Sequence, residues 1–390
     1  MEYGGIKMST KRIMFITGTR ADYGKMKPLM KALDQSPEFE IYVFVCGMHI
    51  SKLFGGTYSE VVKDNYRNIY IAYGLSPTSN ACVNLGDTIS CFSGYVENIE
   101  PDMIIVHGDR MDALAGAIVG ALRNIRVGHI EGGELSGTID ESIRHAISKF
   151  AHAHVVCTEE AKNRLIQMGE EEKRIFVIGS PDIDIMMSDK LPSLLETKKR
   201  YEINFEKYGI LMYHPVTTEY DRIGEKIKAV VDAVIMSSRN YIVIYPNNDL
   251  GSEVILNEYK RFEGCERFRV FPSIRFEYFL TLLKNADFVI GNSSAGIRET
   301  GIYGIPDIDI GTRQNGRYIK TANNNIQHVT EDVEKLIVAI NNTIGLKKNS
   351  SIFGDGKSTE KFMNIIKESA FWSLNIQKHF VDLDAYNKNV

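Results

Sequence analysis

Three acidic residues in the middle of the sequence stand where acid–base chemistry is common. Asp109 follows the apolar run 103–106 and its His-Gly extension, and Glu131 follows the apolar run 125–130. Asp140 opens the next helical pattern. Ligands of parallel α/β sheets bind at the carboxyl ends of the strands. The three carboxylates are therefore predicted to converge on one cleft.

A structural role for the same acids is the alternative. They could cap helices or form ion pairs with nearby arginines, which are Arg110, Arg123 and Arg144. Because structural ion pairs are common, this alternative stands for any single acid. Three acids on strand-end loops within one run of strands and helices favour a site.

A glycine-containing turn, residues 18–25, joins the apolar run 12–17 to a helix predicted over 26–33. Free N–H groups at such a turn attract anions, and Arg20 and Lys25 suit a phosphate or a sugar. The turn lacks the G-x-G-x-x-G fingerprint and the spacing of a Walker A loop. This argues against NAD and against ATP hydrolysis. A tight turn with two solvated cations is the alternative.

A second turn, Gly291-Asn292-Ser293-Ser294, is rich in hydroxyls and backbone N–H groups and precedes a predicted helix. Such a turn suits a diphosphate. Glu299 lies within two helical turns of it, where a carboxylate could accept from ribose hydroxyls. The alternative is that the serines cap the helix and Glu299 is solvated.

Strand and helix patterns alternate along the whole chain, which is typical of doubly wound parallel sheets. The 390 residues are too many for one core. The charged segment 188–205 separates two series of alternating elements. We therefore expect an α/β protein with two Rossmann-like domains facing each other across a cleft. Residues 50–90 show weak periodicity and are predicted to form an irregular segment near the site.

The composition, 44% hydrophobic and 25% charged, is typical of a soluble globular protein. A net charge of -4 does not support a nucleic-acid surface. The sequence contains no run of about 20 apolar residues, so no membrane span is expected. The first residues lack the apolar segment of a signal peptide. Five scattered cysteines suit a reducing cytoplasm and argue against a zinc site.

Seven short motifs, taken in order, resemble the hydrolysing UDP-N-acetylglucosamine 2-epimerases, which make N-acetylmannosamine and UDP for sialic acid synthesis. The motifs are GTRADYGK, HGDR, HIEGGE, GTIDESIRH, HPVTT, GNSSAGIRE and GTRQNGR. A sister branch acts on UDP-N,N'-diacetylbacillosamine in legionaminic acid synthesis. The non-hydrolysing 2-epimerases typically have Pro-Glu where this chain has Ala21-Asp22.

The resemblance implies a GT-B type fold with an N-terminal domain over 1–188 and a nucleotide-binding domain over 189–360. The C-terminal helix within 361–390 is expected to return to the first domain. The resemblance also implies a homo-oligomer, dimer or tetramer, that acts on a UDP-sugar without a cofactor. A non-hydrolysing epimerase, a GT-B glycosyltransferase and a nucleotide-sugar sensor are the alternatives. The three acids argue against a pure sensor, because acids beside a diphosphate repel it.

The implied reaction is loss of UDP and of the proton at the neighbouring carbon, giving a 2-acetamidoglucal to which water adds. Asp109, Glu131 and Asp140 match the catalytic positions, and the sequence does not assign the separate steps to them. The positions that match substrate contacts are Arg20, Asp22, Lys25, Arg110, Glu134, Arg144, His214, Asn247, Ser293, Ser294, Glu299 and Arg313.

Overall fold

The computed structural model describes residues 10–53, 55–75, 80–136, 139–316, 325–343 and 353–382. Its first half contains a seven-stranded parallel sheet with the order β3-β2-β1-β4-β5-β6-β7. The strands are β1 (Lys11–Thr17), β2 (Phe39–Val45), β3 (Asn68–Ile71), β4 (Met103–His107), β5 (Arg126–Ile130), β6 (Ala153–Val156) and β7 (Ile175–Val177).

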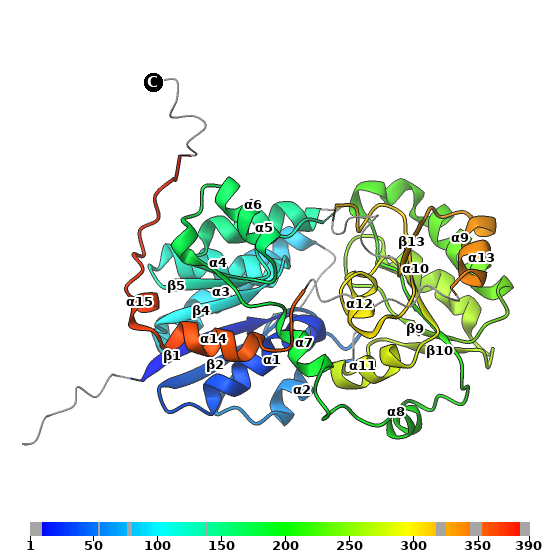
Figure 1. Cartoon of the computed structure of the whole chain (residues 1–390), viewed down its shortest axis with the longest axis horizontal. Coiled ribbons are helices and arrows are strands. Elements are labelled where there is room, and N and C mark those ends of the chain that lie inside the picture. Colours follow the sequence, from blue (N-terminus) through cyan, green and yellow to red (C-terminus); the bar gives the residue numbers. More distant parts are fainter. Residues whose placement is uncertain are drawn as a thin grey trace, which may run out of the picture.

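The second half contains a six-stranded parallel sheet with the order β10-β9-β8-β11-β12-β13. Its strands are β8 (Gly209–Met212), β9 (Tyr241–Ile244), β10 (Phe268–Phe271), β11 (Phe288–Gly291), β12 (Asp307–Ile310) and β13 (Ile326–Val329). Figure 1 shows the two sheets side by side, each with its own helices. The predicted pair of Rossmann-like domains is confirmed.

Helices cover both faces of each sheet, which explains why the strands are continuous apolar runs rather than alternating ones. In β1, Ile13 and Met14 point to opposite faces and belong to separate buried clusters. The helices before β8 are α1 (Arg20–Asp34), α2 (Tyr58–Lys63), α3 (Ala81–Ile99), α4 (Met111–Leu122), α5 (Ile139–Phe150), α6 (Glu159–Gln167), α7 (Pro181–Met186) and α8 (Leu194–Tyr201). Those after β8 are α9 (Ile223–Met236), α10 (Ser252–Tyr259), α11 (Phe276–Lys284), α12 (Glu299–Tyr303), α13 (Val333–Asn341), α14 (Ser358–Lys367) and α15 (Ser369–Trp372).

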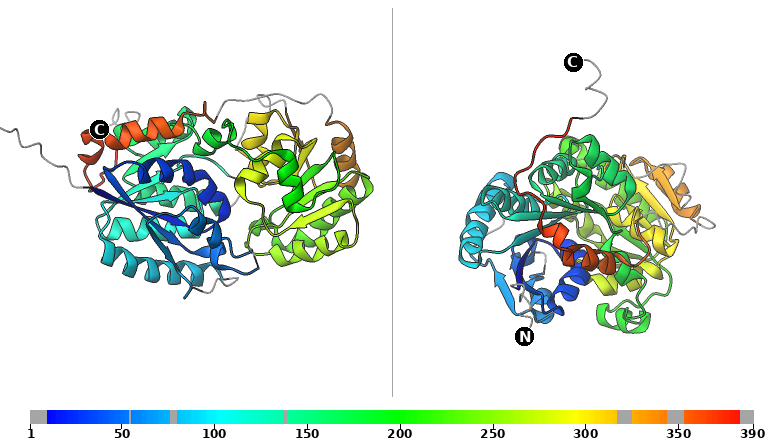
Figure 2. Two further views of the ribbon diagram at one scale, coloured as in Figure 1. Left: turned by 90° about the horizontal axis from the view of Figure 1, so that it is seen from below. Right: turned by 60° about the vertical axis from the view of Figure 1, so that its left-hand side comes forward.

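The chain returns to the first domain at its C-terminal end. Phe362 and Ile366 of α14 are buried in the cluster that contains Ile13 and Met26 of the first domain. Figures 1 and 2 show α14 lying along α1. The predicted helix within 361–390 therefore corresponds to α14 and α15, which end at Trp372. Residues 383–390 of the predicted range lie outside the described part. The domain boundaries at 188 and 360 stay predictions.

Residues 50–90 were expected to be irregular, and this expectation is wrong for much of the segment. It contains α2, β3 and the start of α3. The helical signal of α3 is weak because its buried residues are only Thr88, Phe92 and Val96, and it also contains Gly86 and Gly94. Within this segment, residues 54 and 76–79 lie outside the described part.

The first helix begins at Arg20, earlier than the predicted start at Met26. Thr19 accepts a hydrogen bond from the Asp22 N–H group, and the Asp22 side chain accepts one from the Thr19 N–H group. This reciprocal capping box satisfies backbone donors that a helix start leaves free. Most of the predicted glycine-containing turn is therefore the first turns of α1.

Candidate active site between the two sheets

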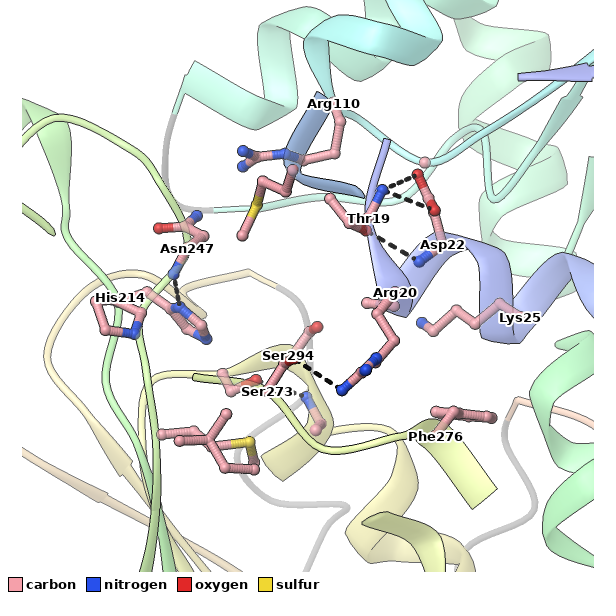
Figure 3. Close-up of a pocket in the computed structure, with 18 of the residues that line it drawn as sticks. Thr19, Arg20, Asp22, Lys25, Arg110, His214, Asn247, Ser273, Phe276 and Ser294 are labelled. Carbon is pink, nitrogen blue, oxygen red and sulfur yellow. Dashed lines mark hydrogen bonds between the residues drawn. The ribbon is translucent and has the colours of Figure 1, made fainter. Parts of the chain in front are cut away.

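A cavity of about 320 Å³ lies between the two domains, at the carboxyl ends of their strands. Every predicted site residue except Glu134 lines it. Figure 3 shows Arg20 and Lys25 from α1 on one side and His214, Asn247 and Ser294 from the second domain on the other. Residues 137–138 and 317, which fall within two of the quoted motifs, lie outside the described part.

Glu131 occupies a left-handed turn after β5, with φ of 63°. Its carboxylate accepts hydrogen bonds from Arg298 Nη2 at 2.7 Å, Lys25 Nζ at 3.3 Å and Ser180 Oγ at 3.3 Å. His107 Nε2 lies 3.3 Å from the same oxygen. Burial raises the pKa of Glu131, but Arg298, Lys25 and His107 more than offset it and hold this pKa well below its usual range. Glu131 is therefore a buried carboxylate held in its ionised form.

Asp109 and Asp140, the other two candidate acids, line the same cavity as Glu131. Asp109 accepts a hydrogen bond from Arg144, which also donates to the Glu131 carbonyl oxygen at 2.6 Å. Asp140 lies in the first turn of α5, and its carboxylate is 3.4 Å from Arg313 Nη2. Burial, followed by the charge of Asp109, raises the pKa of Asp140. The structure thus brings the three predicted acids together and places Asp140 and Glu131 in opposite electrostatic environments.

The ion pairs considered as an alternative for these acids are present in part. Arg144 binds Asp109, whereas Arg110 binds Asp249 and Asn248 in the second domain, at 3.1 and 2.9 Å. Arg123 instead pairs with an exposed glutamate of α3. Because Asp109 still lines the cavity, its ion pair lies within the site rather than outside it.

Asn292 connects the loops of the second domain that face the cavity. Its side-chain oxygen accepts from the His214 N–H group at 2.6 Å, and its side-chain nitrogen donates to the His214 carbonyl oxygen at 2.9 Å. Its backbone carbonyl oxygen accepts from the Gln314 side chain at 2.7 Å. The backbone N–H of Asn247 donates to His214 Nδ1 at 3.0 Å. Burial lowers the pKa of His214 well below its usual value, so the ring is neutral. Since Nδ1 accepts, the ring proton is on Nε2, and His214 can act as a hydrogen-bond donor.

The hydroxyl-rich turn follows β11 as predicted. Gly291 has φ of 143°, and a Cβ atom there would meet the Met212 carbonyl oxygen at 1.9 Å, so only glycine fits. Ser293 accepts from the Ala295 N–H group at 3.4 Å, which is the capping role considered as the alternative. The turn leads into a short 3₁₀ segment and then α12, rather than directly into one long helix.

Glu299 at the start of α12 is buried rather than solvated. Burial, together with the nearby charge of Asp182, raises its pKa against the opposing effect of Lys25. Its Oε2 atom, like Oδ1 of Asn247, has no hydrogen-bond partner among the described residues. Both atoms are therefore acceptors available to a ligand in the cavity.

Asp22 lines the cavity, but its carboxylate is used within the protein. It accepts from Thr17 Oγ1 at 2.6 Å and from the Gly18 and Thr19 N–H groups at 3.0 and 3.1 Å. Its position therefore favours a structural role for the carboxylate over direct contact with a ligand. Arg20, in contrast, reaches into the second domain and donates to Ser273 at 2.7 Å (Figure 3).

Sequence reasoning did not select Arg298 as a site residue. It lies directly before α12, lines the cavity, and donates to both oxygens of Glu134 at 2.8 and 2.7 Å. Glu134 thus does not line the cavity itself, but its carboxylate holds the Arg298 side chain that does. The only sequence signal was that Arg298 adjoins Glu299 in the GNSSAGIRE motif, since its partners lie more than 100 residues away in the chain.

Two further properties of the described residues concern metal binding and membrane crossing. Within the described part of the chain, no group of three or more histidine, cysteine or acidic side chains is arranged to hold a metal ion. None of the described helices has the length and apolarity needed to cross a membrane.

Two parallel-sheet Rossmann-like domains with a site between them define a GT-B-like fold, as predicted. The family model for UDP-N-acetylglucosamine 2-epimerase matches residues 31–367. The chain belongs to this family, which confirms the resemblance seen in the motifs.

Two relatives match over nearly the whole chain. A UDP-N-acetylglucosamine 2-epimerase of Neisseria meningitidis serogroup B is 48% identical over 96% of this chain and 100% of its own. The hydrolysing UDP-N,N'-diacetylbacillosamine 2-epimerase of Legionella pneumophila is 33% identical over 92% of this chain and 96% of its own.

Solved structures agree on the fold at lower identity. A UDP-GlcNAc 2-epimerase from Neisseria meningitidis, bound to UDP-GlcNAc, has a TM-score of 0.79 at 17% identity and covers 91% of this chain and 99% of its own. The Methanocaldococcus jannaschii UDP-GlcNAc 2-epimerase, in complex with UDP-GlcNAc and UDP, has a TM-score of 0.76 at 21% identity. It covers 91% of this chain and 99% of its own. The predicted oligomeric state and cytoplasmic location stay predictions.

Proposed function

We propose that this protein is a hydrolysing 2-epimerase that converts UDP-N-acetylglucosamine to N-acetylmannosamine and UDP. The observation that supports this most directly is the arrangement of the cavity. Three carboxylates from the first domain face the hydroxyl-rich turn, a neutral histidine and an arginine of the second domain. A UDP-sugar would fit this arrangement, with its sugar beside the acids of the first domain and its diphosphate at the hydroxyl-rich turn of the second.

The opposite environments of two acids suggest how the proton transfers are divided. Glu131, held ionised, is suited to accept the proton from the carbon next to the anomeric centre. Asp140, with a raised pKa, is suited to donate a proton. Asp109 adds a negative charge that would stabilise an oxocarbenium-like transition state.

The proposed reaction has two balanced steps. In the first, the C2–H bond breaks, its electron pair forms the C1–C2 double bond, and the C1–O bond to UDP breaks. UDP leaves with the electrons of that bond, and the base holds the proton. In the second step, the oxygen of water bonds to C1 and loses a proton to a carboxylate, while an acid group donates a solvent-derived proton to C2 from the opposite face. The base releases the proton of the first step to solvent. The net result is hydrolysis with inversion at C2, and no electron is gained or lost.

The second domain offers groups suited to the nucleotide. Neutral His214 and the hydroxyl of Ser294 could donate to diphosphate oxygens, and Arg313 supplies a positive charge. The Oε2 atom of Glu299, which has no hydrogen-bond partner among the described residues, could accept hydrogen bonds from ribose hydroxyls. Asn247 has a similar free acceptor for the nucleoside.

The Legionella relative that is described as hydrolysing, together with Ala21-Asp22 in place of Pro-Glu, favours hydrolysis over reversible epimerisation. The substrate of the 48% identical relative makes UDP-N-acetylglucosamine the first choice. UDP-N,N'-diacetylbacillosamine is the second, and it should be tested in parallel.

The test is incubation with each UDP-sugar in heavy water, followed by NMR of the products. We expect free UDP and a manno-configured amino sugar that contains deuterium at C2. A UDP-linked manno sugar would instead identify a non-hydrolysing epimerase. Free UDP with an unlabelled gluco sugar would mean simple hydrolysis and would exclude the elimination. Binding of UDP without any turnover would favour a sensor.

A further inference from the structure

Arg298 belongs to the second domain, yet its side chain makes its hydrogen bonds to the first. Nη1 donates to Glu134, and Nη2 donates to Glu131 at 2.7 Å and to Ser180 Oγ at 2.6 Å. The guanidinium also lies 4.8 Å from the ring centroid of Phe353. With only 4% of its surface exposed, Arg298 is a fully buried bridge between the domains.

The other charges around Glu131 cannot replace this arginine. Lys25 from α1 lies 3.3 Å from Glu131, but also 3.8 Å from Asp182 of α7 and 3.9 Å from Glu299 of α12. One ammonium group is thus shared among three carboxylates, and Glu134 adds a fourth in the same cluster.

The remaining neighbours contribute less. His107 of β4 lies 3.3 Å from the Glu131 carboxylate and is charged only when protonated. Arg144 of α5 is directed to the Glu131 carbonyl oxygen and to Asp109. Cys157, after β6, contacts Arg298 Nη2 at 3.5 Å and is a neutral thiol, because burial raises its pKa well above the usual value. Arg298 is therefore the principal cation of Glu131, and it comes from the opposite domain.

We propose that Arg298 is a positioning residue that keeps Glu131 ionised and oriented only while the two domains are in contact. This inference rests on the proposed function, in which Glu131 accepts a proton. In the closed arrangement Glu131 is removed from water and still charged, which makes it an effective base. Without Arg298, the same burial favours the protonated carboxyl, which cannot accept a proton.

The geometry of the side chain matters as well as its charge. The planar guanidinium binds both Glu131 and Glu134 through different nitrogens. A lysine has a single ammonium group and cannot reproduce this fork. Lysine at this position should therefore restore some of the charge effect but not the full orientation of Glu131.

The experiment compares Arg298→Gln and Arg298→Lys with the matched control Glu277→Gln. Glu277 also bridges the domains, through Lys27 at 2.8 Å, but it does not line the cavity. For each protein that retains the wild-type circular dichroism spectrum, kcat and KM are measured across pH. The carboxyl carbons of labelled glutamates are titrated by NMR, with Glu131→Gln to assign the signal of Glu131.

We expect Arg298→Gln to lower kcat roughly a hundredfold at neutral pH, in the range of acid–base catalysis. The acid limb of its kcat profile and the NMR midpoint of Glu131 should both move up by about one to three pH units. Arg298→Lys should fall between Arg298→Gln and the wild type. Glu277→Gln should keep the wild-type profile, with at most a change in KM.

An unchanged Glu131 midpoint in Arg298→Gln would overturn the inference, and so would a loss confined to KM and shared by Glu277→Gln. The NMR titration does not need turnover, so it separates this inference from the proposed function. If the wild type converts no UDP-sugar but the midpoint moves, the electrostatic role stands and the proposed reaction is wrong.

Discussion

Two glycines beside the candidate acids allow the geometry of the site to be tested quantitatively. Gly108 precedes Asp109 and Gly133 follows Glu131 by two residues, and each has φ of 74°. They differ in the space available to a side chain. A Cβ atom at Gly108 has no atom within 4 Å, whereas one at Gly133 would lie 2.2 Å from the Ala161 carbonyl oxygen.

The expected losses of stability follow from this difference. Alanine in the left-handed region costs about 1–2 kcal/mol relative to glycine, and this applies to both Gly108→Ala and Gly133→Ala. At Gly133 the overlap with backbone requires a shift of the chain, which adds roughly 1–3 kcal/mol. Gly133→Ala should therefore lose about 2–5 kcal/mol of unfolding free energy, and Gly108→Ala about 1–2 kcal/mol.

The measurements are urea denaturation and steady-state turnover with the substrate identified by NMR. Because Gly133 can relieve the overlap by moving the turn that holds Glu131, Gly133→Ala should also reduce kcat more than Gly108→Ala. Misplacement of a catalytic group by about 1 Å can lower the rate about a hundredfold. Equal destabilisation by the two substitutions, or an unaffected Gly133→Ala, would refute the packing argument.

The remaining predictions concern the acids, the nucleotide and the domains. Amide replacement of each candidate acid should lower turnover roughly a hundredfold or more while UDP affinity, measured by calorimetry, stays nearly intact; any variant with normal turnover removes its residue from the catalytic group. These variants are Asp109→Asn, Glu131→Gln and Asp140→Asn. Substitutions at the hydroxyl-rich turn should weaken UDP binding, with about 1.5–3 kcal/mol for a hydrogen bond to a charged group; unaltered affinity in all of them would locate the nucleotide elsewhere. They are Ser293→Ala, Ser294→Ala and Glu299→Gln. Small-angle scattering should show a smaller radius of gyration with UDP than without it, because the cavity is lined from both domains and a nucleotide bound there would draw them together. An identical radius in both states would favour a rigid cleft.

The sequence by itself determined the architecture and the neighbourhood of the site. Continuous apolar runs separated by helical patterns can form parallel sheets only when helices cover both faces. The carboxyl ends of such strands lie at one edge, so Asp109 and Glu131 had to approach each other once β4 and β5 were paired. Their motifs also led to the correct family. Local signals failed where the pattern was weak, as in α3 with its two glycines and few buried residues.

Only the tertiary structure decided what each of these side chains contacts. Asp22 stays a predicted ligand contact, and the structure adds that its carboxylate forms a capping box at the start of α1. Arg298 was not selected from the sequence, but it donates to Glu131 across 167 positions of the chain. The pKa directions of two acids likewise depend on the fold. Burial and the charge of Asp109 raise the pKa of Asp140, whereas at Glu131 the effect of burial is outweighed by Arg298 of the opposite domain and by Lys25. Electrostatic energy depends on distance in space and on exclusion of water, and neither quantity is present in the local order of residues.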